Sequence, residues 1–292
     1  MSKKRLLIIG GTGKMGGWLA KFFKDKGFEV LISGRSLQKT RDTAEKLGVG
    51  YAYPYVEAVK EADMVAVSTP IQATPKIVLE VAPHLKKEAI LFDLASIKKD
   101  VLPALEKAQT YNIHALSLHP MFGPGAKTVK NKNILVIPVT RKTEVLDVVL
   151  KPFLLDGAKI VFVEDAETHD KMVALTLALP HFLNMVFGGV LASAGIEIEK
   201  IKSFGGSTFR FQLMLTEEVF QEDPKLYAEI QTNNKYFPQI LEKLVRQVEE
   251  LKKTVLEGKI EEFTDFFSRV REFLAKDREF GEAYKRLYRV LE

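Results

Sequence analysis

The feature that most constrains the fold is a glycine pattern directly after a short apolar run near the N-terminus. Four aliphatic residues at positions 6–9 lead into Gly11-Thr12-Gly13-Lys14-Met15-Gly16, and apolar residues at helical spacing follow over residues 15–26. A strand, a glycine turn and a helix in this order aim backbone N–H groups and a helix N-terminus at one point, where a pyrophosphate can bind. We therefore predict a nicotinamide dinucleotide site at residues 11–16, against the alternative of a glycine turn without a ligand.

Each glycine of this pattern has an expected role. Gly11 should allow the tight turn after the strand, and Gly13 should let backbone N–H groups approach the pyrophosphate. Gly16 should let the helix pack closely on the strand.

The end of the second predicted strand bears on which dinucleotide binds. An NAD site has an acidic residue there, whereas this chain reads Ser33-Gly34-Arg35-Ser36. The Arg35 guanidinium offers donors for a 2′-phosphate, and the hydroxyls of Ser33 and Ser36 can add hydrogen bonds. We therefore predict NADP as the cofactor, with NAD as the alternative and a solvated loop charge as the other interpretation of Arg35.

Alternating apolar runs and helical stretches predict an α/β fold for the first half of the chain. Besides residues 6–9, strands are expected at residues 28–32, 64–67, 89–92, 113–118, 134–138 and 159–163. This order predicts a Rossmann-type doubly wound parallel sheet over residues 1–164. Residues 165–292 carry only helical patterns, over 166–194, 197–203, 209–221, 224–257 and 259–290. We interpret the longest apolar region, around residues 172–194, as a buried core helix rather than a membrane span.

Composition excludes several classes of protein and site. The net charge of +5 is spread along 292 residues, without the basic, aromatic-lined stripe of a nucleic-acid-binding protein. The absence of cysteine excludes disulfides, thiolate metal sites and cysteine nucleophiles, and we predict no bound metal. The apolar run at residues 6–9 is too short for a secretory signal, so we expect a cytoplasmic protein without a membrane partner.

Two polar segments follow predicted strands at the sheet edge where ligands bind in such folds. They are Asp93-Leu94-Ala95-Ser96-Ile97-Lys98 and His119-Pro120-Met121-Phe122-Gly123-Pro124. A histidine held at a strand end suits proton transfer near neutral pH. Taken alone, however, the residue is slightly better interpreted as a loop cap.

Together with the glycine loop, these segments resemble the prephenate dehydrogenase family of tyrosine biosynthesis. The similarity covers nearly the whole chain in the family's order, through Gly10–Gly16, Ser68–Ile71, Asp93–Lys98, His119–Pro124, His169-Asp170, Pro180–Phe182 and Asp223–Ala228. It implies a nicotinamide-dependent dehydrogenase with a Rossmann-type domain at 1–164 and an all-helical substrate and dimerisation domain at 165–292. It also adds Thr69 to the expected cofactor-binding residues. A homodimer is expected as well, because the apolar helices have more surface than one small domain can cover.

The resemblance implies oxidative decarboxylation of prephenate to 4-hydroxyphenylpyruvate. By analogy, His119 accepts the proton of the substrate's 4-hydroxyl, and Ser96 is its partner. His181 matches a family position near the substrate, whereas His169 is expected to be structural or near the domain hinge. For Lys98, a structural role and a place near substrate anions remain equally open.

One position departs from the family pattern. Family members place an arginine five residues before the Asp-Pro pair, and this chain has Glu218 there. A carboxylate would repel a substrate carboxylate, so we expect the anchor to be either Arg210, eight residues earlier on a similar helix face, or a basic residue from elsewhere in the chain. The alternative interpretation of Arg210 is a structural one. Arogenate, with an amine in place of the side-chain ketone, is therefore an alternative substrate.

Two further alternatives lie outside this chemistry. A protein that binds NADP as a sensor or scaffold without turnover would explain Glu218 but not His119. An imine or acid reductase would leave the His119–Pro124 segment unexplained. Relatives often carry a fused chorismate mutase or regulatory domain, and we expect neither within these 292 residues.

Overall fold

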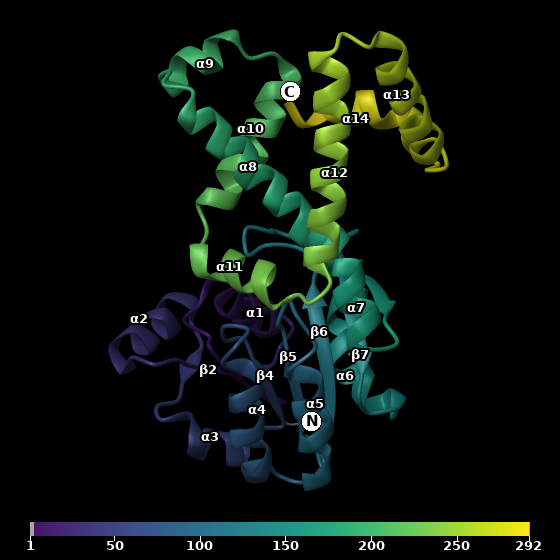
Figure 1. Cartoon of the computed structure of the whole chain (residues 1–292). Coiled ribbons are helices and arrows are strands. Elements are labelled where there is room, and N and C mark those ends of the chain that lie inside the picture. Colours follow the sequence, from purple (N-terminus) through teal and green to yellow (C-terminus); the bar gives the residue numbers. More distant parts are fainter. Residues whose placement is uncertain (1–2, 292) are drawn as a thin grey trace. The chain divides into compact units, whose positions relative to one another are not determined.

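The computed structural model describes residues 3–291 and divides into two compact units, the first ending at Val173 and the second beginning at Ala174 (Figure 1). The first unit is α/β. Its strands and α-helices are β1 Arg5–Ile9, α1 Lys14–Asp25, β2 Glu29–Ser33, α2 Leu37–Leu47, β3 Gly50–Tyr51, α3 Tyr55–Glu61, β4 Met64–Val67, α4 Thr74–Val81, β5 Ile90–Asp93, α5 Val101–Ala108, β6 His114–Pro120, β7 Asn133–Pro138, α6 Thr143–Leu155, β8 Lys159–Phe162 and α7 Ala166–Val173.

The described strands form one sheet in the order β3-β2-β1-β4-β5-β6-β7-β8. The Rossmann-type architecture is confirmed, but the sheet is mixed, because β7 runs antiparallel to β6 while the other neighbours are parallel. The expectation of a fully parallel sheet is wrong at this pair. No helix lies in the described connection over residues 121–132, and a parallel partner requires a longer crossover, usually a helix.

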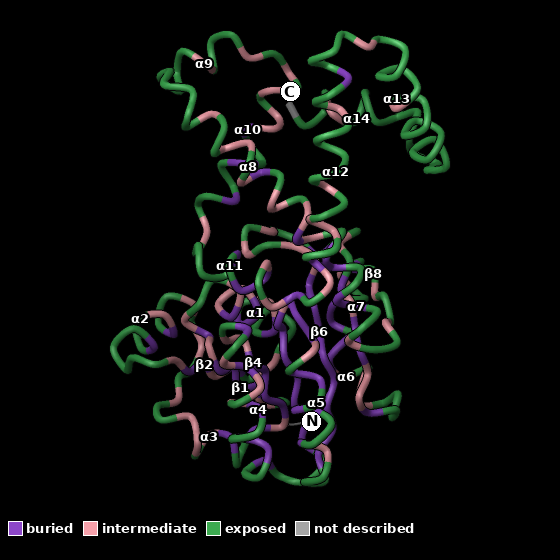
Figure 2. Tube along the Cα trace, in the orientation of Figure 1, coloured by how far each residue is buried: buried purple, intermediate pink, exposed green. Residues whose placement is uncertain are grey.

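Alternate residues of β1 pack into two different hydrophobic layers. Leu6 and Ile8 lie in the layer beneath α1, α2 and α6, whereas Leu7 and Ile9 lie in the layer beneath α3, α4 and α5. Helices therefore cover both faces of the sheet, and Figure 2 shows the burial concentrated along its strands. This two-sided burial explains why the strand is a continuous apolar run.

The turn between β1 and α1 is built from glycines that approach other backbone segments closely. Gly10 has a φ of +88°, and a Cβ there would lie 2.1 Å from the carbonyl oxygen of Ser68, at the end of β4. A Cβ on Gly11 would lie 2.5 Å from Ile32 Cβ, and one on Gly16 would lie 2.4 Å from the Gly10 carbonyl oxygen. The tight turn expected at Gly11 thus occurs one residue earlier, and Gly11 is needed for its approach to β2.

The second unit is helical. The structure continues from α7 through a π-helical segment, Ala174–Ala178, into α8 Leu179–Ser193, followed by α9 Ile198–Phe204, α10 Ser207–Phe220, α11 Pro224–Asn233, α12 Phe237–Leu256, α13 Ile260–Leu274 and α14 Ala283–Leu291. The π-helical segment precedes Pro180, which has no N–H for an intrahelical hydrogen bond. The helical patterns predicted over 224–257 and 259–290 are each interrupted, near residues 234–236 and 275–282.

The apolar run Ala166–Ser193 is not a buried core helix within this chain. By length and composition alone it could cross a membrane, and only 22% of its most apolar window is buried. Several of its large apolar side chains are exposed, among them Met172, Leu175, Leu183, Val186 and Val190. The sequence prediction of burial is therefore wrong for the single chain, because the chain does not itself supply cover for these side chains.

We expect Gly10→Ala to destabilise the first unit by about 1–3 kcal/mol more than Gly27→Ala does. Both glycines have left-handed backbone, with φ of +88° and +86°, but a Cβ on Gly27 would meet nothing within 4 Å. Gly27→Ala should therefore cost only the conformational penalty of about 1–2 kcal/mol. Urea unfolding, followed by the fluorescence of Trp18, the single tryptophan, measures the free energy of unfolding of both variants. Equal losses of unfolding free energy would contradict the argument that Gly10 is needed for its close approach to Ser68.

Candidate active site

The residues predicted to select the cofactor lie at the carboxyl end of β2, next to the glycine turn. The carbonyl of Ser33 accepts hydrogen bonds from the N–H groups of Gly10 and Gly11 at 2.9 and 3.0 Å, and the Ser33 side chain is fully buried. Ser33 therefore holds the turn through its backbone, and its hydroxyl has no hydrogen-bond partner within residues 3–291. The Arg35 side chain is exposed, and the Ser36 hydroxyl caps α2 by accepting from the Lys39 N–H at 3.3 Å.

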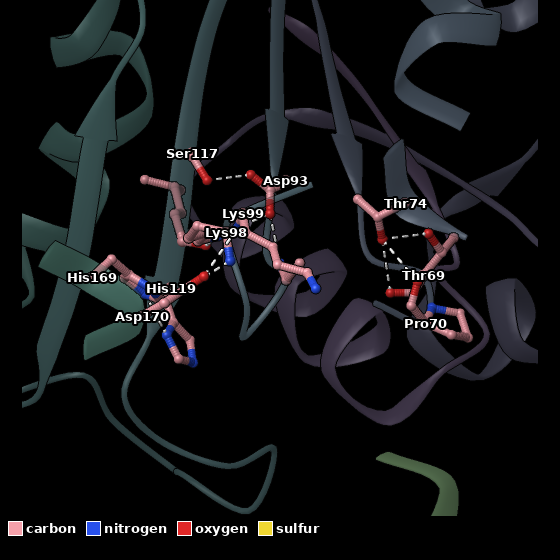
Figure 3. Close-up of polar contacts among 12 residues, drawn as sticks. Thr69, Pro70, Thr74, Asp93, Lys98, Lys99, Ser117, His119, His169 and Asp170 are labelled. Carbon is pink, nitrogen blue, oxygen red and sulfur yellow. Dashed lines mark hydrogen bonds and ion pairs between the residues drawn. The ribbon is translucent and has the colours of Figure 1, made fainter. Parts of the chain in front are cut away.

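Two threonines extend this site. A Cβ on Gly34 would lie 2.8 Å from the side chain of Thr12, which places Thr12 beside the β2–α2 loop. Thr69 follows β4, and its methyl group would lie 3.1 Å from a Cβ on Gly10. Its hydroxyl is 2.9 Å from that of Thr74 (Figure 3). The chain thus brings both predicted residues to the glycine turn.

The remaining predicted loop residues lie at the start of α1. Lys14 is its first residue and is exposed, whereas Met15 is partly buried and packs against the hydrophobic core. Gly13 is the N-cap residue, without a side chain to occupy the space before the helix. Backbone space and a helix N-terminus at the crevice between β1 and β4 suit the pyrophosphate of a dinucleotide.

A buried ion pair joins the ends of β5 and β6. The Lys98 ammonium donates to Asp93 Oδ2 at 2.9 Å and to the Leu118 carbonyl at 2.8 Å, and it is 1% exposed (Figure 3). Ser117 donates to the other oxygen of Asp93 at 2.5 Å. Burial lowers the pKa of Lys98, while the charge of Asp93 opposes the shift. Of the two roles left open by the sequence, these contacts favour the structural one.

His119 lies near the end of β6 in a chain of hydrogen bonds that reaches α7. Its Nδ1 is 2.9 Å from His169 Nε2, and His169 Nδ1 is 2.8 Å from Asp170 Oδ1 (Figure 3). The Asp170 carboxylate also accepts the backbone N–H groups of Lys98 and Lys99, at 2.9 and 3.1 Å. The loop after β5 and the start of α7 are therefore joined at this carboxylate.

The order of donors along this chain sets the tautomer of His119. A carboxylate can only accept, so His169 carries its proton on Nδ1 and presents a bare Nε2. That nitrogen then accepts from His119 Nδ1–H, which leaves the lone pair of His119 on Nε2. Nε2 makes no hydrogen bond within residues 3–291, so it is available to a ligand.

Both imidazoles are held in the neutral state. Burial, and secondarily the charges of His169 and Lys98, lower the pKa of His119 well below 6.5. Burial also lowers the pKa of His169, although Asp170 opposes the shift. At neutral pH His119 is therefore a base with a defined free nitrogen.

The orienting partner of His119 differs from the predicted one. Ser96 lies half-buried in the loop after β5, and its hydroxyl makes no hydrogen bond within the described chain. His169 makes the contact that was predicted for Ser96. The adjacent His169-Asp170 pair was the available signal, since a carboxylate beside a histidine commonly fixes its tautomer.

The predicted substrate-binding residues His181 and Arg210 belong to the second unit. His181 contacts the ring of Tyr227 at a centroid distance of 4.7 Å, and burial lowers the pKa of His181 to about 4, so it is uncharged at pH 7. Burial first, then the charges of Glu218 and Glu222, raise the pKa of Tyr227 to about 12. Arg210 and Glu218 are both exposed on α10, separated by about 12 Å along its axis.

Two family profiles together match most of the chain. The profile described as "Prephenate dehydrogenase, nucleotide-binding domain" matches residues 19–162, and "Prephenate dehydrogenase, dimerization domain" matches residues 165–269. The first match begins after the glycine turn, so the assignment of that turn rests on its own geometry.

Individual similar proteins also carry prephenate or arogenate dehydrogenase in their names. The "probable arogenate/prephenate dehydrogenase" of Methanocaldococcus jannaschii is 28% identical over 95% of this chain, which spans 62% of that protein. A crystal structure of prephenate dehydrogenase from A. aeolicus with hydroxyphenyl propionate and NAD+ has a TM-score of 0.75 at 18% identity, covering 95% of this chain and 99% of that one. Synechocystis arogenate dehydrogenase has a TM-score of 0.69 at 21% identity, covering 93% and 99%. At these identities the structures establish the fold.

Proposed function

Since the chain belongs to the prephenate dehydrogenase family and uses a nicotinamide dinucleotide, we propose that it oxidatively decarboxylates prephenate to 4-hydroxyphenylpyruvate in tyrosine biosynthesis. The observation that carries this proposal is the hydrogen-bonded series Asp170, His169 and His119, which leaves a basic Nε2 on His119. In this proposal residues 1–164 bind the cofactor and residues 165–292 bind the substrate and a second copy of the chain.

His119 has the properties that the oxidation step needs. Its Nε2 accepts the proton of the substrate's 4-hydroxyl as that carbon loses hydride and becomes a carbonyl. The bound nicotinamide supplies the hydride acceptor. Loss of the ring carboxylate as carbon dioxide then makes the ring aromatic, and the proton on Nε2 can return to the phenolic oxygen. Protons and electrons balance without a further reactant.

Four other predicted residues have a role beside His119 in this proposal. Ser96, whose hydroxyl has no partner in the described chain, is free to hydrogen-bond to the substrate hydroxyl. His181 contacts the substrate as a neutral group, and Arg210 binds a substrate carboxylate in place of the family's missing arginine. Lys98 has a structural role, because its ammonium already donates hydrogen bonds to the Asp93 carboxylate and to the Leu118 carbonyl.

We expect His119→Asn to lower kcat by about 10²–10⁴-fold with prephenate and NADP, because Asn lacks the basic nitrogen. KM should change little. In the wild type, kcat/KM should fall only at a pH below 6.5, since protonation removes the base and the pKa of His119 is lowered. The variant should lack this acid limb. The absorbance of the reduced cofactor, followed over time, measures both the change in kcat and the pH dependence of kcat/KM.

His114→Gln is the matched control, because His114 begins the same strand and contacts Glu88 at the opposite sheet edge. It should leave kcat and the acid limb unchanged. An unchanged kcat in His119→Asn would remove His119 from the mechanism. No turnover of prephenate or arogenate by the wild type, with NAD or NADP, would favour a cofactor-binding sensor without catalysis.

Arogenate dehydrogenation is the second candidate, and the charge near His181 favours it. Glu218 acts electrostatically on Tyr227, whose ring contacts His181. A negative charge there stabilises the ammonium of arogenate and repels the side-chain carboxylate common to both substrates. Turnover of the two substrates side by side discriminates between them.

We propose NADP rather than NAD on the basis of Arg35, the exposed cation at the end of β2. Arg35→Ala should lower the ratio of kcat/KM with NADP to kcat/KM with NAD by about tenfold or more, through loss of charge-assisted hydrogen bonds to the 2′-phosphate. Arg41→Ala, an exposed arginine on α2, is the control and should leave the ratio unchanged. A wild-type preference for NAD would reject the assignment.

We also propose a cytoplasmic homodimer. The match to a dimerisation domain over residues 165–269 and the exposed apolar side chains along 166–193 support burial against a second copy. Analytical ultracentrifugation should give a mass near twice the 32.9 kDa chain. A monomer at micromolar concentration would contradict the proposal.

A further inference from the structure

Trp18 makes two contacts with the loop that follows His119, one on each side of its turn. Its indole Nε1–H donates to the Ala126 carbonyl at 2.7 Å, and its ring meets the Phe122 ring edge-on at a centroid distance of 5.0 Å. Between these contacts, a Cβ on Gly123 or Gly125 would meet nothing within 4 Å, so little else packs against the turn there.

The same side chain belongs to the helix that receives the cofactor. Trp18 lies four residues after Lys14, the first residue of α1, and therefore on the same face one turn further along. A groove of about 710 Å³ lies along this face, lined by Gly13 and Trp18 on one side and by residues 124–129 on the other. The cofactor turn and the loop after His119 are thus walls of one groove.

The Trp18 ring also packs against the hydrophobic core of the first unit. Its ring stacks on Phe22 at 5.3 Å, and Phe22 stacks on the buried Phe153 of α6 at 4.5 Å. An aromatic side chain packed on a rigid core, with its polar end bonded to a loop, can transmit a small displacement of its own helix to that loop.

We propose that Trp18 is a positioning residue that couples cofactor binding at the start of α1 to the order of the loop over residues 121–129, and so to the placement of His119. The inference rests on the proposed function, since it takes the glycine turn as the cofactor site and His119 as the base. By reciprocity, a substrate that orders this loop also raises the affinity for the cofactor.

Hydrogen exchange with and without saturating NADP tests the proposal on the full chain. In the wild type, the cofactor should slow exchange at the start of α1 and, by about fivefold or more, over residues 121–129. In Trp18→Phe, which keeps a ring but loses the N–H donor, α1 should still be protected, while the loop protection should fall to less than about twofold. The same variant should lower kcat, and saturating substrate should no longer raise its affinity for NADP.

Phe28→Leu is the matched control, because it weakens packing of the same core through Phe23, but the Phe28 ring makes no contact with the Trp18 ring and the bond to Ala126 stays in place. It should keep the loop protection. Protection of α1 without protection of the loop in the wild type would overturn the coupling and leave the proposed function standing. No protection of α1 would instead reject the cofactor site. A wild-type measurement therefore decides even if the Trp18 variant fails to fold.

Discussion

The hydrogen bond between His119 Nδ1 and His169 Nε2 is the interaction on which the chemistry of this site depends. It has one direction only, because Asp170 takes the other proton of His169 and cannot donate in return. Asp170 is placed in turn by two backbone N–H groups of the loop after β5, and the ion pair of Lys98 with Asp93 closes that loop onto β6. Burying two charges stabilises a fold weakly at best, so the value of this pair lies in fixing geometry.

A second constraint acts at the turn between β1 and α1. The β1–α1 turn fits only because Gly10 lies against Ser68 and Gly16 lies against Gly10, which brings the helix N-terminus to the crevice beside β4. The loop after His119 then lies along this helix through Trp18. The cofactor turn and the proposed base therefore lie in the same compact unit, so no interdomain linker separates them.

The sequence predicted the parts of this fold that local pattern determines. Runs such as Leu6–Ile9 are buried on both faces, and their position between turns was sufficient to place the strands. Strand direction at β7 and the φ of Gly10 depend on which segments meet in space, and no local pattern records that. The His169-Asp170 pair indicated a histidine with a fixed tautomer, but not that His119 would be its partner. The wrong prediction for the apolar helix has a different cause. An apolar helix face indicates that its side chains must be buried, but it does not indicate that this chain supplies the residues that bury them.

Prephenate and arogenate, the two substrates considered in the proposed function, differ only in the side chain, away from the ring carbon that loses hydride. Both substrates lose the same hydride and the same carboxylate, so His119 cannot distinguish them. The second unit supplies a neutral His181 next to a tyrosine whose pKa the charge of Glu218 helps to raise. Arg210, the cation proposed for the substrate carboxylate, lies on the same helix as Glu218, about 12 Å away along the axis of α10. In the proposed function, discrimination therefore depends on the balance between the charges of Glu218 and Arg210, which is an electrostatic property and not one of ring chemistry.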